Sequence, residues 1–175
     1  MSDFVLDHLF VMTDRDAPEA DDLVLRGYVE GEPNQHPGQG TMCRRFFFAN
    51  AMLEFLWVEN EREARSAMVH PLRLWERWAG RDSGACPFGI ALRPTAPGLM
   101  PPFPTFQYFP SFFPAPAYVD VQAELVQLPL KLCLPYFERP PRDGPVLTSY
   151  KIEGPSPHVM QIEFEGLPPL RFGGG

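Results

Sequence analysis

Two polar side chains, His8 and Glu54, stand in otherwise apolar segments that are typical of strands. His8 lies within residues 4–12 (FVLDHLFVM), and Glu54 lies within residues 52–58 (MLEFLWV). Alternate residues of a strand share a face, so each polar group has apolar neighbours on its own face. An unpaired polar group is costly there. We therefore expect the two groups to meet, where they could bind a divalent metal (Zn, Ni, Mn or Fe), hydrogen-bond to each other in the core, or transfer protons to a small molecule.

Four further residues are candidates for contacts with a small molecule. Arg44 and Arg45 precede three phenylalanines in a strand-like run, and alternation sends one of them inward, where a guanidinium would bind a carboxylate or phosphate. The sequence leaves open which one. His36, in a Gly/Pro-rich turn, lies either at the mouth of a pocket or on the surface. Tyr108 and its phenylalanine neighbours either line a cavity or form a second small core.

Composition limits the class of protein. A chain of 175 residues with 45% hydrophobic residues is the size of one domain with a real core. Its 22 prolines exclude a fold of mostly long helices. The net charge of −7 argues against nucleic acid or an anionic membrane as the main partner.

Cysteine usage and the N-terminal sequence indicate the cellular compartment of the protein. Cys43, Cys86 and Cys133 are widely spaced, which favours buried free thiols over disulfides or a zinc ribbon. The acidic start resembles no signal peptide, and no apolar run reaches the roughly 18 residues that a membrane span needs. We therefore expect a cytoplasmic protein that does not contact a membrane.

The order of the elements predicts the fold class. In the first half we expect a strand at 4–12, a helix at 17–26 with Leu23 and Val24 facing the sheet, extended chain at 28–30 and a hairpin of strands at 43–49 and 52–58. Helices at 61–79, divided at Pro71, follow. In the second half we expect strands at 87–93, at 117–133 with an interruption at Pro129, at 146–152 and at 160–164, and an ordered extended loop at 94–116 that carries eight prolines and six aromatics.

This order predicts an α+β fold in which two βαβββ-like modules form curved mixed sheets around an open pocket. The Pro/aromatic-rich loop takes the place of the helix in the second module. We assign 1–60 to the first module, 61–85 to linker helices, 86–170 to the second module and 171–175 to a flexible tail, all within one compact domain.

Several short motifs, taken in order, resemble the vicinal oxygen chelate superfamily and its glyoxalase-like branch. They are Leu6-Asp7-His8, Gly27-Tyr28, the turn 36–41 (HPGQGT), Leu53-Glu54 and the strand 86–93 (CPFGIALR). The resemblance implies a metal held by residues of the first and fourth strands, here His8 and Glu54. The fifth strand, 88–92, has no His, Glu or Gln, and Glu163 in the last strand is the remaining candidate ligand.

Two functions are considered. In the first, the protein binds a small oxygen-containing molecule in its central pocket and carries out isomerase or lyase chemistry of the glyoxalase kind, with His8 and Glu54 as metal ligands or as an acid–base pair. In the second, it is a metal-free protein that binds or sequesters a small molecule. The resemblance also makes a homodimer a candidate assembly. A proline-rich docking segment for an SH3-like partner is a weaker alternative, because the interleaved rings favour burial.

Overall fold

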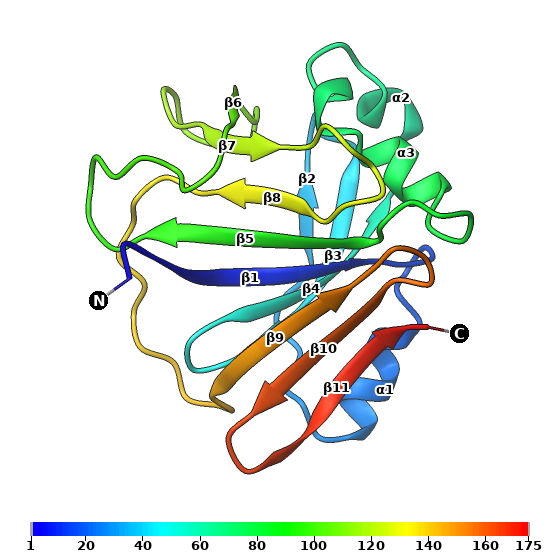
Figure 1. Ribbon diagram of the computed structural model, residues 1–175, viewed down its shortest axis with the longest axis vertical. Helices are drawn as coiled ribbons and strands as arrows, with labels where there is room; N and C mark the ends of the chain where they lie inside the picture. Colours follow the sequence, from blue (N-terminus) through cyan, green and yellow to red (C-terminus); the bar gives the residue numbers. More distant parts are fainter. Residues whose placement is uncertain (1, 175) are drawn as a thin grey trace.

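Across residues 2–174 the fold consists mainly of two β-sheets, with three short α-helices (Figure 1). It is described by a computed structural model that covers residues 2–174. The strands are β1 (Phe4–Met12), β2 (Asn34–His36), β3 (Thr41–Phe47), β4 (Met52–Val58), β5 (Phe88–Pro94), β6 (Phe106–Tyr108), β7 (Val119–Gln122), β8 (Leu130–Cys133), β9 (Leu147–Glu153), β10 (Val159–Phe164) and β11 (Leu167–Gly173). The helices are α1 (Glu19–Leu25), α2 (Glu61–Ala64) and α3 (Leu74–Ala79), and a 3₁₀ turn, η1, spans His70–Leu72.

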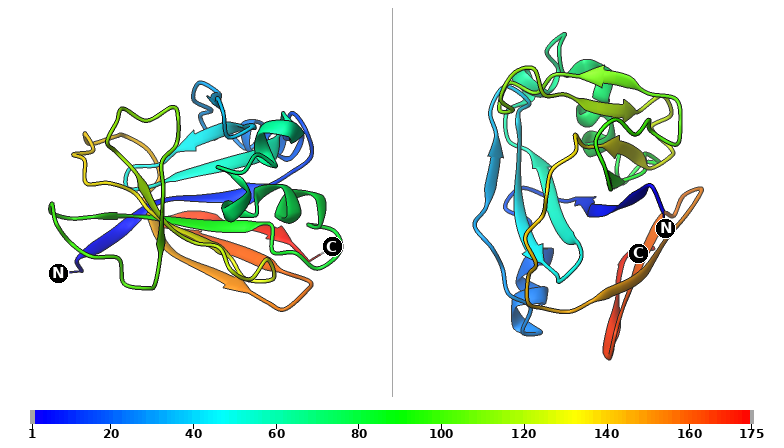
Figure 2. Two further views of the ribbon diagram at one scale, coloured as in Figure 1. Left: turned by 90° about the horizontal axis from the view of Figure 1, so that it is seen from above. Right: turned by 90° about the vertical axis from the view of Figure 1, so that its left-hand side faces the viewer.

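The larger sheet has eight strands in the order β2-β3-β4-β1-β5-β8-β7-β6. Its two central strands, β1 and β5, are antiparallel to each other. Outward from this centre the two halves repeat the same pattern: β1 pairs in parallel with β4 and β5 pairs in parallel with β8, and the outer strands are antiparallel. The sheet curls so that its two ends approach each other (Figure 2). The expected α+β class and curved mixed sheet are therefore confirmed.

Alternation along β1 assigns its side chains to the two faces of this sheet. Leu9 and Val11 pack on the convex face against Met160 and Ile162 of β10. The three-stranded antiparallel sheet β11-β10-β9 therefore covers the convex side and makes the main core. His8 and Phe10 point to the concave side.

The first half of the chain differs from the prediction in two places. Helix α1 is shorter than expected and starts after Pro18. Its Leu23 is buried as predicted, but Val24 is 45% exposed, because the short helix has room for only one apolar stripe against the sheet. Extended pairing also begins later than residues 28–30, apart from a single bridge between Glu30 and Phe46, since β2 starts at Asn34.

The second half also departs from the prediction. The loop 94–116 contains a strand, β6, which pairs with β7. The last strand of the eight-stranded sheet along the chain is β8, which ends at Cys133, and residues 147–173 form the separate three-stranded sheet. The expected tail is wrong for residues 171–173, because β11 pairs with β10, with Arg171 opposite Gln161. Residues 1 and 175, assigned to the first module and to the tail, lie outside the described residues.

Two other expectations concern the whole chain. All three cysteines are buried and free, as predicted. Within the described chain, no helix is long and apolar enough to cross a membrane.

Candidate functional site

The concave face of the curled sheet holds a cavity of about 350 Å³. This volume lies within the range of small-molecule sites in proteins, about 300–1,000 Å³. Polar groups of β1 to β4 line one side, and mainly apolar groups of β6, β7, β8 and the segment after β6 line the other.

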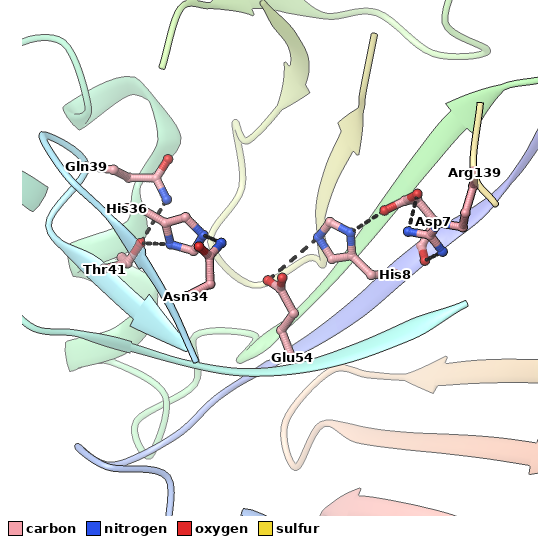
Figure 3. A network of polar contacts seen from close by, with 8 residues as sticks. All are labelled: Asp7, His8, Asn34, His36, Gln39, Thr41, Glu54 and Arg139. Carbon is pink, nitrogen blue, oxygen red and sulfur yellow. Dashed lines mark hydrogen bonds and ion pairs between the residues drawn. The ribbon is translucent and has the colours of Figure 1, made fainter. Parts of the chain in front are cut away.

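His8 and Glu54 meet inside this cavity, as the sequence predicts. His8 Nε2 lies 3.8 Å from Glu54 Oε2, and both side chains are about nine-tenths buried. This distance is longer than a hydrogen bond, so both atoms remain free to contact a third group. Figure 3 shows the Glu54 carboxylate between the rings of His8 and His36.

Asp7 supports the His8 ring from the other side. A β-bulge between Leu6 and His8 in the pairing of β1 with β5 places Asp7 beside its neighbour. His8 Nδ1 lies 2.8 Å from Asp7 Oδ2. Burial opposes protonation of the ring, but the Glu54 and Asp7 carboxylates outweigh it, and the pKa of His8 is raised above its usual value. The ring therefore holds a proton well and presents Nε2 to the cavity.

Asp7 is itself held by arginines. Arg139 Nη2 lies 2.6 Å from Asp7 Oδ1, and Arg93 Nε lies 3.6 Å from the same oxygen. Burial raises the pKa of Asp7, but His8 and these arginines outweigh burial and lower it below the usual value. Sequence reasoning missed Asp7 and Arg139 as site residues. The available signal for Asp7 was a second polar residue directly before His8 in an apolar strand.

His36 lies at the same cavity, as a buried residue and not as a surface turn residue. Its Nε2 is 3.0 Å from the Asn34 amide nitrogen, and its Nδ1 is 2.9 Å from the Thr41 hydroxyl, which also accepts a hydrogen bond from the Gln39 amide. Burial, aided by the positive charges of His8 and Arg45 and opposed by Glu54, lowers the pKa of His36. His36 is therefore a fixed, neutral part of the cavity wall.

The two arginines of β3 point in opposite directions, as alternation predicts. Arg45 lies opposite Glu54 in the β3–β4 pairing and lines the cavity. Arg44 faces the other side, where its guanidinium donates to the carboxylates of Glu30 and Asp21. The expectation that Arg44 binds substrate is therefore wrong, because its guanidinium is held away from the cavity by these two contacts.

Tyr108 lies in the apolar wall of the cavity, which confirms the lining role for this residue. Burial raises the pKa of its hydroxyl to about 12, so it stays protonated at neutral pH. The same side chain belongs to a second apolar cluster with Phe10 and Leu130. Both alternatives considered for this segment, cavity wall and small core, therefore hold in part. Other large apolar side chains of the wall include Phe112, Phe113, Val119, Leu130, Leu132 and Leu134.

Glu163 is not brought to the site. Its neighbours Ile162 and Phe164 point into the main core, so Glu163 faces outward from the three-stranded sheet, beyond the convex face. There it accepts a hydrogen bond from the Gln161 amide. The expectation that Glu163 is a metal ligand is wrong, because two layers of β-structure separate it from Glu54.

The remaining donors do not make a usual divalent-metal site. Cross-strand pairing puts Gly89 and Ala91 of β5 opposite Phe10 and His8, and neither offers a ligand. Across residues 2–174, no three His, Cys, Asp or Glu side chains are grouped so that they could hold a metal ion. His8 and Glu54 alone fall short of the three protein ligands that catalytic zinc usually has.

Comparison with known proteins adds little to this geometry. The chain matches no protein-family model and no curated protein. A solved structure, that of a hypothetical protein from Staphylococcus aureus, aligns over 97% of this chain and 86% of its own, with 11% sequence identity and a TM-score of 0.43.

Proposed function

We propose that this protein binds a small oxygen-containing molecule in the concave cavity and transfers a proton on it, with His8 as the acid and Glu54 as the base. The observation that carries the proposal is the line Asp7–His8–Glu54, which opens into a cavity of about 350 Å³ with an apolar opposite wall. One polar edge and one apolar wall suit a ligand with a carbonyl or hydroxyl group on an apolar body.

The proposed step needs no other reactant. The Glu54 carboxylate removes a proton from the carbon next to a carbonyl group, while protonated His8 donates its Nε2 proton to the carbonyl oxygen. The product is the enol, and the reverse transfers return a proton to the same carbon and restore the carbonyl compound. Asp7 accepts the Nδ1 hydrogen bond and keeps the ring oriented and charged.

We further propose that the chain is a member of the vicinal oxygen chelate superfamily, in its glyoxalase-like branch, and that it works without a metal. Support comes from strand order: β5-β8-β7-β6 repeats β1-β4-β3-β2 around the cavity, with a loop in place of the helix. This would be two βαβββ-like modules, the second spanning β5 to β8. A metal-assisted version would need a third ligand, and the residues described above do not supply one.

Exchange of carbon-bound hydrogen for deuterium tests the proposed step. The probes are phenylpyruvate and phenylacetone, whose benzylic protons lie next to a carbonyl group, followed by NMR in D₂O. We expect the protein to accelerate exchange, and His8→Gln or Glu54→Gln to slow the accelerated rate about 100-fold or more. Glu163→Gln, a carboxylate outside the cavity, is the matched control and should keep the wild-type rate. No acceleration over buffer, or full acceleration by the Glu54→Gln variant, would contradict the proposal.

A metal-free binding protein is the second candidate. The observation that favours it is the apolar wall formed by Leu130 and Leu132 of β8 and by Leu134, which follows β8. These side chains can bury an apolar ligand, and they carry no catalytic group. Saturable binding of phenylacetone with no acceleration of exchange would support this function over the first.

A further inference from the structure

Two arginines at the cavity lie against one aromatic ring and have no carboxylate partner among residues 2–174. The Arg142 guanidinium carbon is 3.9 Å from the centre of the Phe47 ring, and that of Arg45 is 5.3 Å from the same centre. Arg45 comes from β3, whereas Arg142 comes from the segment between β8 and β9. All three side chains line the cavity.

The Phe47 ring, on which these groups lie, packs closely against Gly31. A Cβ atom on Gly31 would come within 2.2 Å of the ring, so the ring occupies the space that any other residue at position 31 would fill. Stacking on an aromatic face holds a guanidinium in place and leaves the N–H groups at its edge available.

The hydrogen-bonding capacity of the two arginines is largely unused. Within residues 2–174, neither guanidinium forms an ion pair with a carboxylate, in contrast to Arg44 and Arg139. Arg45 donates only from Nε, to the Glu32 carbonyl oxygen. Arg142 Nη1 is sealed from solvent and has no hydrogen-bond partner in the described chain.

The charge around the cavity also favours binding of an anion. Its lining includes the guanidiniums of Arg45, Arg139 and Arg142 but only two carboxylates, Asp7 and Glu54. Arg139 is already paired with Asp7, which leaves Glu54 as the single remaining carboxylate of the lining against the two guanidiniums of Arg45 and Arg142. This positive site lies in a protein with a net charge of −7, so the excess is local.

We infer that Arg45 and Arg142, stacked on Phe47, bind the acid group of the ligand, and that the ligand is a small carboxylic acid with an apolar body. This inference rests on the proposed binding of a small molecule in the cavity. A guanidinium fork matches the two oxygens of a carboxylate. A singly charged carboxylate also suits the site better than a doubly charged phosphate, because Glu54 lies opposite Arg45 on the neighbouring strand.

The bound acid would lie across the cavity in a defined direction. Its carboxylate would contact Arg45 and Arg142, its apolar body would contact the leucines of β8, and the atoms next to the carboxylate would lie over Glu54 and His8. Arg45, Glu54 and His8 belong to the neighbouring strands β3, β4 and β1, which gives this direction.

Binding of two matched probes tests the inference. 2-Naphthoate and 2-naphthamide share the ring and differ in the charge of the polar group, and NMR titration of the labelled protein gives both dissociation constants. We expect at least tenfold tighter binding of the naphthoate. Arg45→Gln and Arg142→Gln should each weaken naphthoate binding about tenfold and leave naphthamide binding unchanged. Arg62→Gln, which removes the same charge from the exposed surface of α2, should change neither.

The outcomes separate this inference from the proposed function. Equal affinity for the two probes, or full naphthoate affinity in both arginine variants, overturns the acid anchor while cavity binding stands. Binding of neither probe overturns both. If an arginine variant does not fold, the wild-type protein still tests the inference. Its affinity for naphthoate should fall as the NaCl concentration is raised, whereas its affinity for naphthamide should not. A naphthoate affinity that is insensitive to salt overturns the acid anchor.

Discussion

The Asp7 carboxylate and the His8 imidazole, neighbours in the chain, contact each other at 2.8 Å inside the fold. In a regular strand these side chains would point to opposite faces. The bulge in β1 removes that restriction, so the strand supplies both the proton-carrying ring and the group that orients it. Bulges are common next to active sites because they redirect a side chain in this way.

Removal of the Asp7 charge should destabilise the protein strongly. Asp7→Asn leaves the buried Arg139 guanidinium without its counter-ion, and breaking one side of a buried ion pair typically costs about 3–5 kcal/mol. We expect the free energy of unfolding, measured by urea denaturation, to fall by about 3 kcal/mol. The exposed Asp3→Asn should change it by less than about 0.5 kcal/mol. A loss below about 1 kcal/mol for Asp7→Asn would contradict the described pairing.

The two cavity histidines should titrate on opposite sides of their ordinary pKa of 6.5. NMR of the ring Hε1 protons against pH should give a pKa above 6.5 for His8 and below 6.5 for His36. Glu54→Gln should lower the pKa of His8, because it removes the carboxylate charge that contributes most to raising it. A His8 pKa below 6.5 in the wild-type protein would contradict the acid role.

These two shifts affect stability with opposite sign. The folded state holds the His8 proton more tightly than the unfolded chain does, so the His8 contribution is complete below about pH 6.5 and is lost as the pH rises through its folded pKa. His36 resists protonation in the fold, so its contribution is present above about pH 6.5 and is lost as the pH falls through its lowered pKa. His8→Gln should therefore abolish the fall in the free energy of unfolding that accompanies a rise in pH through the folded pKa of His8. Measurement of the free energy of unfolding against pH checks this.

Gly89 should not tolerate a side chain. A Cβ atom there would come within 1.9 Å of the Phe10 ring, which lies over β5. Gly89→Ala should cost about 1–3 kcal/mol of stability by overpacking. The double variant Phe10→Leu/Gly89→Ala should be less destabilised than the sum of the two single variants, because the clash needs the ring. Strict additivity in urea denaturation would show that Phe10 does not cover Gly89.

Divalent metals should have little effect on the protein. Because His8 and Glu54 lack a third ligand, we expect EDTA, or added Zn, Ni, Mn or Fe, to leave the melting temperature and the probe exchange rate unchanged. A tightly bound metal would raise the melting temperature, by an amount that grows with the logarithm of the ratio of metal concentration to dissociation constant. Stoichiometric metal that is lost in a His8→Ala/Glu54→Ala variant would restore the metal-assisted function that the resemblance implies.

The sequence was sufficient for the fold class and for the meeting of His8 and Glu54, because period-2 alternation assigns faces within β1 and β4. It also gave the opposite directions of Arg44 and Arg45. It was not sufficient for Glu163, whose position depends on which sheet β10 joins, a matter of long-range pairing. Strand β11 was missed because Pro168 and Pro169 argue against a strand, yet β11 lies at the edge of its sheet, where prolines are tolerated.

At the site, Asp7 and Arg142 likewise could not be predicted from the sequence alone. A bulge is a local irregularity that alternation cannot foresee, and it alone directs Asp7 toward His8. Arg142 lies in a proline-rich turn nearly 100 positions after Arg45, and only the folded chain places both on Phe47. Function likewise depends on the site and not on the fold class.

Intermolecular NOEs from bound 2-naphthoate test the central claim most directly, because they locate the molecule relative to named side chains. We expect contacts from the naphthyl protons to the methyl groups of Leu130 and Leu132 and to the His8 ring. Contacts confined to residues outside the concave cavity would show that a small molecule does not bind beside His8 and Glu54, and the proposed site would then be wrong.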